Sequence, residues 1–170
     1  MTNKIIGIQG DKLDKINISS DTSIFLAHEA QKLGYKIFYY TPSNLSIIKN
    51  KTYANGVFVK LNYERKKFYK IYKKQKIDVE NFKFILIRQD PPFNSEYLIT
   101  TLILDNLKKT RVINNPVAIR NVSEKLYSKK FTKYMPDTIF SNNIEEVKKF
   151  YKQNKCIIMK PINGYGGNQI

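Results

Sequence analysis

The chain has 170 residues, of which 42% are hydrophobic and 26% charged, with 30 basic and 14 acidic side chains, one cysteine and one histidine. This length suits one domain, or a domain and part of a second, and the apolar content excludes a chain that is disordered throughout. A single cysteine with a single histidine excludes an internal disulfide and a structural zinc site. The apolar runs are too short for a membrane span or a secretory signal, so we expect a cytoplasmic protein with no membrane partner.

The net charge of +16 raises the question of a nucleic-acid partner, because basic surfaces attract phosphates. Only four of the basic residues are Arg, however, and both base readout and bidentate phosphate binding favour Arg over Lys. The stretch at 65–76 (RKKFYKIYKKQK) fits either a nucleic-acid-binding stripe with stacking aromatics or a solvated edge strand or short helix. We favour the second interpretation and predict no nucleic-acid partner. A basic nucleic-acid-binding module is the alternative from another class.

Hydrophobic periodicity over the first 120 residues predicts alternating strands and helices. Asp21 and Asn94 are candidate N-caps of two helices, and Gly34 is a candidate residue just past the end of the first. A hairpin can turn at either Lys49–Lys51 or Asn55–Gly56. The predicted elements are a strand at 4–9, a helix at 21–33, a strand at 35–40, a hairpin within 45–61, a strand at 84–87, a helix from 94 to about 109 and a strand at 111–113. The strand–helix–strand opening predicts a Rossmann-like α/β domain with a parallel sheet.

The pattern changes after residue 120. The predicted elements there are a helix at 123–131, a break at Met135–Pro136, a strand at 138–140, a helix capped by Ser141 or Asn142, and a strand at 156–160. Within the last strand, Cys156 has the pattern of a small buried hydrophobic residue. His28 lies in the first predicted helix, away from every motif, and we interpret it as a structural or surface residue.

Two segments that follow apolar strands are candidates for ligand binding. Arg88–Phe93 (RQDPPF) begins where the strand at 84–87 ends, which is the sheet edge where open α/β folds bind ligands. The loop at 163–167 (NGYGG) follows Lys160, and its glycines let backbone amides approach phosphate oxygens while the lysine offsets their charge. Taken alone, a flexible hairpin turn explains these glycines equally well.

Together, several short segments closely resemble bacterial glutathione synthetases, which are ATP-grasp ligases. They are Arg88–Phe93, Asn114–Pro116, Ile119–Arg120, Glu124–Leu126, Met159–Pro161 and Asn163–Gly167. Lys-Pro before a glycine-rich loop indicates only the ATP-grasp superfamily, whereas the Arg-x-Asp-Pro-Pro-Phe segment narrows the choice. The resemblance covers essentially the whole chain. It implies a Rossmann-like pre-ATP-grasp domain at 1–120 and the beginning of an ATP-grasp (α+β) domain at 121–170.

The resemblance also implies a reaction and its site. The reaction is the ATP-dependent ligation of γ-glutamylcysteine and glycine through an acyl phosphate, which gives glutathione, ADP and phosphate. The implied ATP site consists of Lys125, Lys160, Gly164, Tyr165, Gly166 and Gly167. Arg88, Asp90 and Pro91 are candidates for shaping the peptide site. Another ATP-grasp carboxylate-amine ligase is the alternative within enzymes.

A final implication of the resemblance concerns what lies outside the chain. Such ligases use Mg²⁺, and we expect its ligands beyond residue 170, so no metal ligand and no catalytic residue is assigned here. We therefore expect the chain alone to be inactive, whether it is a natural truncation, a gene fragment or one part of a split enzyme. Relatives of this kind also imply a homo-oligomer.

Overall fold

The computed structural model describes residues 4–64 and 67–164. The chain forms two compact units, Met1–Ile119 and Arg120–Ile170, which are considered separately. No helix in the described part of the chain is long and apolar enough to cross a lipid bilayer.

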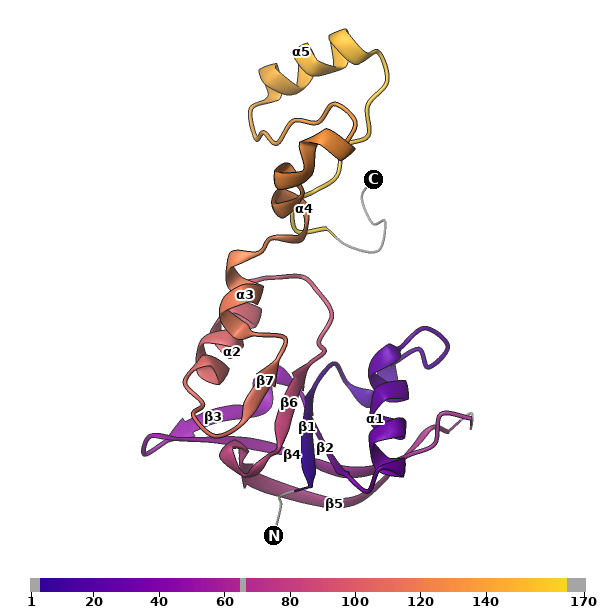
Figure 1. Cartoon of the computed structure of the whole chain (residues 1–170), viewed down its shortest axis with the longest axis vertical. Helices are drawn as coiled ribbons and strands as arrows, with labels where there is room; N and C mark the ends of the chain where they lie inside the picture. Colours follow the sequence, from indigo (N-terminus) through magenta and orange to yellow (C-terminus); the bar gives the residue numbers. More distant parts are fainter. Residues whose placement is uncertain (1–3, 65–66, 165–170) are drawn as a thin grey trace. The chain divides into compact units, whose positions relative to one another are not determined.

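The first unit is built on a seven-stranded mixed sheet (Figure 1). Its strands are β1 (Ile5–Gln9), β2 (Lys36–Tyr40), β3 (Leu45–Ile48), β4 (Lys51–Leu61), β5 (Tyr69–Asp78), β6 (Phe84–Ile87) and β7 (Arg111–Ile113). Strands β2, β1, β6 and β7 are parallel neighbours, whereas β3, β4 and β5 pair antiparallel. The predicted α/β fold with a parallel sheet is therefore confirmed, and the three antiparallel strands β3, β4 and β5 extend that sheet. The carboxyl ends of β1, β2 and β6 meet at one edge.

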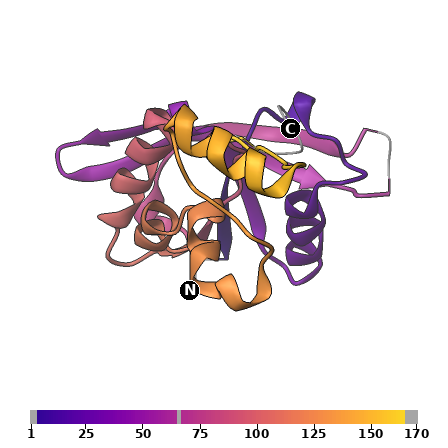
Figure 2. The ribbon, with the colours of Figure 1, turned by 90° about the horizontal axis from the view of Figure 1, so that it is seen from above.

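Helices cover both faces of the parallel strands (Figures 1 and 2). The helices of this unit are α1 (Thr22–Lys32) and α2 (Ser95–Asp105), and α3 (Pro116–Asn121) begins in this unit and ends in the second. Short 3-10 turns lie at Leu13–Lys15, Pro42–Asn44 and Val79–Asn81. Ile24 and Ala27 of α1 pack in one core, and Leu104 of α2 packs in the other. The sheet is thus buried on both sides, which explains the nearly continuous apolar run of β6.

Both predicted N-caps are confirmed. The Asp21 carboxylate accepts a hydrogen bond from the Ile24 amide at 2.9 Å, and the Asn94 side chain accepts one from the Tyr97 amide at 3.0 Å. Gly34 has a positive φ of 83° just past α1, as its position predicts. The second helix is shorter than predicted and ends at Asp105. The chain turns after Asp105, and the backbone amides of residues 108–110 donate to the Glu80 carboxylate instead of continuing the helix.

The antiparallel strands decide where the predicted hairpin turns and what the basic stretch at 65–76 forms. The turn between β3 and β4 lies at Lys49 and Asn50, whose φ values of 48° and 60° are left-handed, and Asn55–Gly56 lies inside β4. Most of the 65–76 stretch that the structure describes belongs to β5, an antiparallel neighbour of β4 with an almost entirely exposed burial pattern. This confirms the edge-strand interpretation of that stretch.

The second unit has less regular structure than its sequence predicts. It contains α4 (Glu124–Tyr127), a 3-10 segment at Ser128–Tyr134 and α5 (Ile144–Asn154). The predicted strands at 138–140 and 156–160 are wrong, because neither segment pairs with another strand among the described residues, and a strand exists only through backbone hydrogen bonds to a neighbour. The N-cap of α5 is Asn143 rather than Ser141 or Asn142. Cys156 is exposed, so the prediction that it is buried is also wrong.

Candidate functional site

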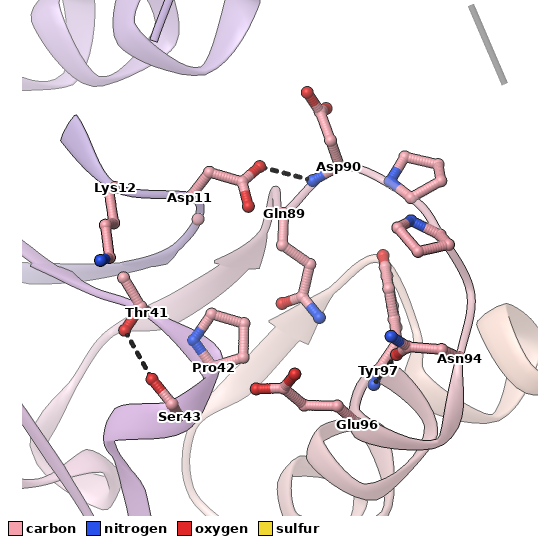
Figure 3. Close-up of a pocket in the computed structure, with 13 residues that line it drawn as sticks. Asp11, Lys12, Thr41, Pro42, Ser43, Gln89, Asp90, Asn94, Glu96 and Tyr97 are labelled. Atoms are coloured by element: carbon pink, nitrogen blue, oxygen red, sulfur yellow. Dashed lines mark hydrogen bonds between the residues drawn. The ribbon is translucent and has the colours of Figure 1, made fainter. Parts of the chain in front are cut away.

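An open cavity of about 280 Å³ lies in the first unit at the carboxyl ends of β1, β2 and β6 (Figure 3). Its walls come from the three loops that directly follow these strands and from the start of α2. The lining residues are Gly10, Asp11, Lys12, Thr41, Pro42, Ser43, Gln89, Asp90, Pro91, Pro92, Asn94, Glu96 and Tyr97. The parallel topology thus gathers polar side chains at the edge where open α/β sheets bind ligands.

The loop after β1 holds the loop after β6 in place. The Asp90 amide donates to a carboxylate oxygen of Asp11 at 2.9 Å (Figure 3). The Tyr39 hydroxyl donates to the Asp11 backbone carbonyl at 2.7 Å. The residue before Asp11 must be glycine, because a Cβ at Gly10 would come within 2.2 Å of the Tyr39 hydroxyl oxygen. Tyr39 is buried in the core, with 4% of its surface exposed, and its hydroxyl supports the loop after β1 from beneath.

The cavity wall carries three carboxyl groups, of Asp11, Asp90 and Glu96, beside the single lysine Lys12. Burial, followed by the negative charges of Asp11 and Asp21, raises the pKa of the Asp90 carboxyl, and Arg88 opposes this effect only in part. Burial also raises the pKa of the Tyr97 hydroxyl, Arg88 opposes this effect, and Asp11 and Asp90 add to it. Asp11 adds to the shift of Asp90 because the two carboxylates repel one another, and an ammonium group placed between them would be attracted to both.

The three candidate residues after β6 differ in their position relative to the cavity. Asp90 and Pro91 line the cavity, whereas Arg88 does not. The Arg88 guanidinium instead donates to the hydroxyl oxygens of Ser23 and Thr22 at the start of α1, both at 2.8 Å. Arg88 thus ties the loop after β6 to α1.

A buried polar chain lies behind the cavity and was missed by sequence reasoning. The Gln9 side-chain NH₂ group donates to the side-chain oxygen of Gln89, and the Gln89 side-chain NH₂ group donates to the Thr100 hydroxyl at 3.4 Å. Gln89 is 8% exposed, and its side chain extends into the middle of the cavity region in Figure 3. A signal was present, since Gln9 ends an otherwise apolar strand, and a buried glutamine needs polar partners.

A second group of candidate residues meets in the second unit. Lys125 in α4 donates from its ammonium group to the carbonyl oxygen of Ile162 at 3.3 Å and to that of Gly164. The Gly164 amide in turn donates to the Pro161 carbonyl at 3.1 Å, which closes a turn directly after Lys160. The structure therefore brings Lys125 to the first glycine of the predicted phosphate loop. Lys160 is exposed, and Tyr165, Gly166 and Gly167 lie outside the described residues.

Two family models match consecutive parts of the chain. Residues 5–120 match the family model described as prokaryotic glutathione synthetase, N-terminal domain, and residues 124–170 match the one described as prokaryotic glutathione synthetase, ATP-grasp domain. The chain belongs to the prokaryotic glutathione synthetase family. The resemblance drawn from short motifs is thereby confirmed, and so is the order of an N-terminal domain followed by ATP-grasp sequence.

Curated relatives agree with the family models. The chain is 37% identical over 163 residues to a glutathione synthetase of Mesorhizobium japonicum, an alignment that covers 95% of this chain and 52% of the relative. It is 35% identical over 167 residues to the glutathione synthetase of Buchnera aphidicola from Acyrthosiphon pisum and 34% identical over 167 residues to that of Salmonella typhimurium. These alignments cover 97% of this chain and 52% and 53% of the relatives. The chain thus spans about half the length of the curated relatives that it matches.

The described residues contain no cluster of metal ligands. No three His, Cys, Asp or Glu side chains in ranges 4–64 and 67–164 converge as metal ligands. Mg²⁺ prefers several oxygen ligands in octahedral geometry, and the cavity carboxylates do not form such a set. The described residues therefore do not fit the metal that the family implies, and no step of the chemistry below is assigned to it.

Proposed function

We propose that the chain carries substrate-binding parts of a glutathione synthetase, an enzyme that joins γ-glutamylcysteine and glycine at the expense of ATP. The observation that carries this proposal is the contact of Lys125 with the backbone at Ile162 and Gly164. A cation at the start of a glycine-rich loop is what a triphosphate needs, because phosphoryl transfer depends on positioning and charge neutralisation more than on covalent chemistry. Family membership supplies the reaction class.

In this proposal the second unit binds ATP. The ammonium groups of Lys125 and Lys160 offset the charge of the phosphates, and amides of the loop that starts at Gly164 and includes Tyr165, Gly166 and Gly167 donate to phosphate oxygens. Lys125 then exchanges the two carbonyl oxygens that it contacts for phosphate oxygens, which accept a charge-assisted hydrogen bond more strongly.

The cavity of the first unit binds the peptide substrate in this proposal. Its carboxylates suit the ammonium group of γ-glutamylcysteine, and Lys12 and the hydroxyl of Ser43 suit the α-carboxylate beside it. Asp90 and Pro91 form the wall, while Arg88 shapes the site by holding their loop against α1. The support for this assignment is the mixed charge of a cavity that lies where α/β sheets bind ligands.

The proposed reaction proceeds in two balanced steps. A cysteinyl carboxylate oxygen of the peptide attacks the γ-phosphorus of ATP, the bond to the β,γ-bridging oxygen breaks, and ADP leaves. The amine of glycine then attacks the acyl phosphate carbon, an amide bond forms, phosphate leaves, and the amine loses a proton. Exclusion of water protects the acyl phosphate from hydrolysis between the steps.

The test is an ATP titration of the 170-residue chain by isothermal titration calorimetry. We expect Lys125→Ala to weaken ATP binding at least tenfold, because one tenfold step corresponds to about 1.4 kcal/mol and a lost charge-assisted bond exceeds this. Lys129→Ala is the matched control, since Lys129 is an exposed lysine of the adjacent 3-10 segment. Equal losses in both variants, or no loss in Lys125→Ala, would refute the ATP site.

A further inference from the structure

Among the residues that line the cavity of the first unit, Gln89 alone has a polar side chain that is buried. The other polar lining residues, such as Asp11, Lys12 and Asp90, are exposed or half-buried, whereas Gln89 is 8% exposed. Its side chain extends into the middle of the cavity region in Figure 3. A ligand group that leaves solvent in this cavity therefore meets the side-chain amide of Gln89.

Neighbouring hydrogen bonds decide how that amide is oriented. The Thr100 hydroxyl donates its single hydrogen to the Tyr97 carbonyl at 2.8 Å, so its oxygen can only accept from Gln89. The NH₂ group of Gln89 therefore faces Thr100, and the side-chain oxygen of Gln89 accepts from the NH₂ group of Gln9. Gln9 and Thr100 thus hold the Gln89 amide in one of its two orientations.

The Gln89 amide, held in this way, keeps one hydrogen for a ligand. An NH₂ group carries two hydrogens, and Thr100 is its only acceptor within residues 4–64 and 67–164. A buried N–H group without an acceptor costs free energy, because it has lost water and gained no partner. A ligand oxygen placed against this hydrogen would remove that cost.

An uncharged carbonyl oxygen suits this donor best. The Gln89 amide has no charge, and a carboxylate buried against it would lose more solvation free energy than an amide carbonyl would. The carboxyl groups of Asp11, Asp90 and Glu96 on the cavity wall would also repel a ligand carboxylate at this point. The amide of γ-glutamylcysteine offers such an uncharged oxygen, and the charged groups of the peptide lie on either side of it.

We propose that Gln89 determines specificity for a γ-glutamyl amide by donating from its NH₂ group to the amide carbonyl oxygen of the peptide, and that Gln9 and Thr100 are positioning residues for this hydrogen bond. The inference rests on the peptide site of the proposed function and assigns new residues to it. Gln9 does not line the cavity, so it acts only through Gln89.

The test is a titration of the ¹⁵N-labelled 170-residue chain with γ-glutamylcysteine, followed by two-dimensional NMR, which detects weak as well as tight binding. Triple-resonance spectra assign the side-chain NH₂ signals, so this measurement does not depend on the folding of any variant. One of the two Gln89 NH₂ protons should shift downfield as the carbonyl oxygen binds. The control is Gln75, an exposed glutamine of β5, whose NH₂ signals should not shift.

Variants test the same hydrogen bond through the affinity for the peptide. Gln89→Met keeps the length of the side chain but removes the donor, and it should weaken binding about tenfold because the ligand carbonyl is then buried without a partner. Gln9→Met should weaken binding several-fold, since the Gln89 amide can then turn its oxygen toward the ligand. Gln9 tolerates this change, because its own side-chain oxygen has no hydrogen-bond partner among the described residues. Gln75→Met should leave the affinity unchanged.

The outcomes separate this inference from the peptide site on which it rests. Wild-type binding that Gln89→Met leaves unchanged, or binding without a shift of the Gln89 NH₂ signals, would overturn the role of Gln89 alone. An affinity of Gln9→Met equal to that of the wild type would overturn the positioning role. No binding of the peptide by the wild-type chain would refute the peptide site itself and the role of Gln89 with it.

Discussion

Glu80 is expected to stabilise the first unit through one carboxylate that accepts three backbone hydrogen bonds. The amides of Lys108, Lys109 and Thr110 donate to it at 2.7, 2.9 and 2.9 Å, which fixes the connection between α2 and β7. Glu80→Gln keeps the shape of the side chain but replaces one acceptor oxygen by an NH₂ group that faces amide donors. The substitution should therefore lower the free energy of unfolding of this unit.

The magnitude follows from the partners that are lost. A hydrogen bond to a charged group contributes roughly 1.5–3 kcal/mol, and the two bonds that reach the second oxygen are weakened by solvent because the side chain is only partly buried. We therefore expect a loss of about 2 kcal/mol at pH 7. Glu29→Gln is the control, because Glu29 pairs with Lys32 on the surface and such pairs contribute about 0.5 kcal/mol.

The pH dependence gives a sharper test. Burial raises the pKa of Glu80, but hydrogen bonds from the three amides and the charge of Lys109 outweigh burial, so the pKa in the folded protein is lower than usual. A carboxyl group with a lowered pKa contributes stability above its unfolded pKa, and this contribution disappears as the pH falls through the folded pKa. Urea unfolding followed by circular dichroism should show a gap between wild type and Glu80→Gln at pH 7 that narrows below about pH 4. A gap of constant size down to pH 2, or no gap at pH 7, would refute this reasoning.

Two further predictions concern the site and its support. Gly10→Ala should lower the free energy of unfolding of the first unit by roughly 1–3 kcal/mol in urea unfolding, because the new Cβ meets the Tyr39 hydroxyl. Adding Tyr39→Phe removes that hydroxyl and should restore part of the stability. A loss that is the same in the Gly10→Ala/Tyr39→Phe double variant would count against this steric cause. Asn94→Ala should lower the free energy of unfolding by about 1 kcal/mol because it removes the N-cap of α2, whereas Asn94→Asp should change it little. Equal melting curves for the wild type and both variants would contradict the capping role.

The sequence predicts the parallel part of the fold because local signals agree there with the tertiary structure. Asp21 and Asn94 cap helices through their own side chains, and Gly34 supplies the positive φ that ends α1, so these features are readable from neighbouring residues. The length of α2 was not readable, because it depends on Glu80, which lies 28 residues before the first amide that it accepts. The same holds for the choice of hairpin turn, which depends on the pairing of β4 with its neighbours.

The candidate site was predicted in part for the same reason. Asp90 and Pro91 belong to a motif that follows a strand, so the sequence predicts their place at the sheet edge, whereas Lys12, Ser43 and Glu96 reach the cavity from loops and a helix far apart in the sequence. In the second unit, the apolar run at 156–160 was predicted as a strand from composition alone. Composition predicts the tendency to pair, but the strand forms only when a neighbouring strand is present.

A structure of the chain bound to a non-hydrolysable ATP analogue tests the central claim most directly. The account predicts that the ammonium nitrogens of Lys125 and Lys160 both lie about 2.7–3.2 Å from phosphate oxygens of the same nucleotide, with the Lys125 contacts to Ile162 and Gly164 released. A nucleotide bound away from Lys125, or one that contacts only a single lysine while the loop contacts persist, would contradict the account.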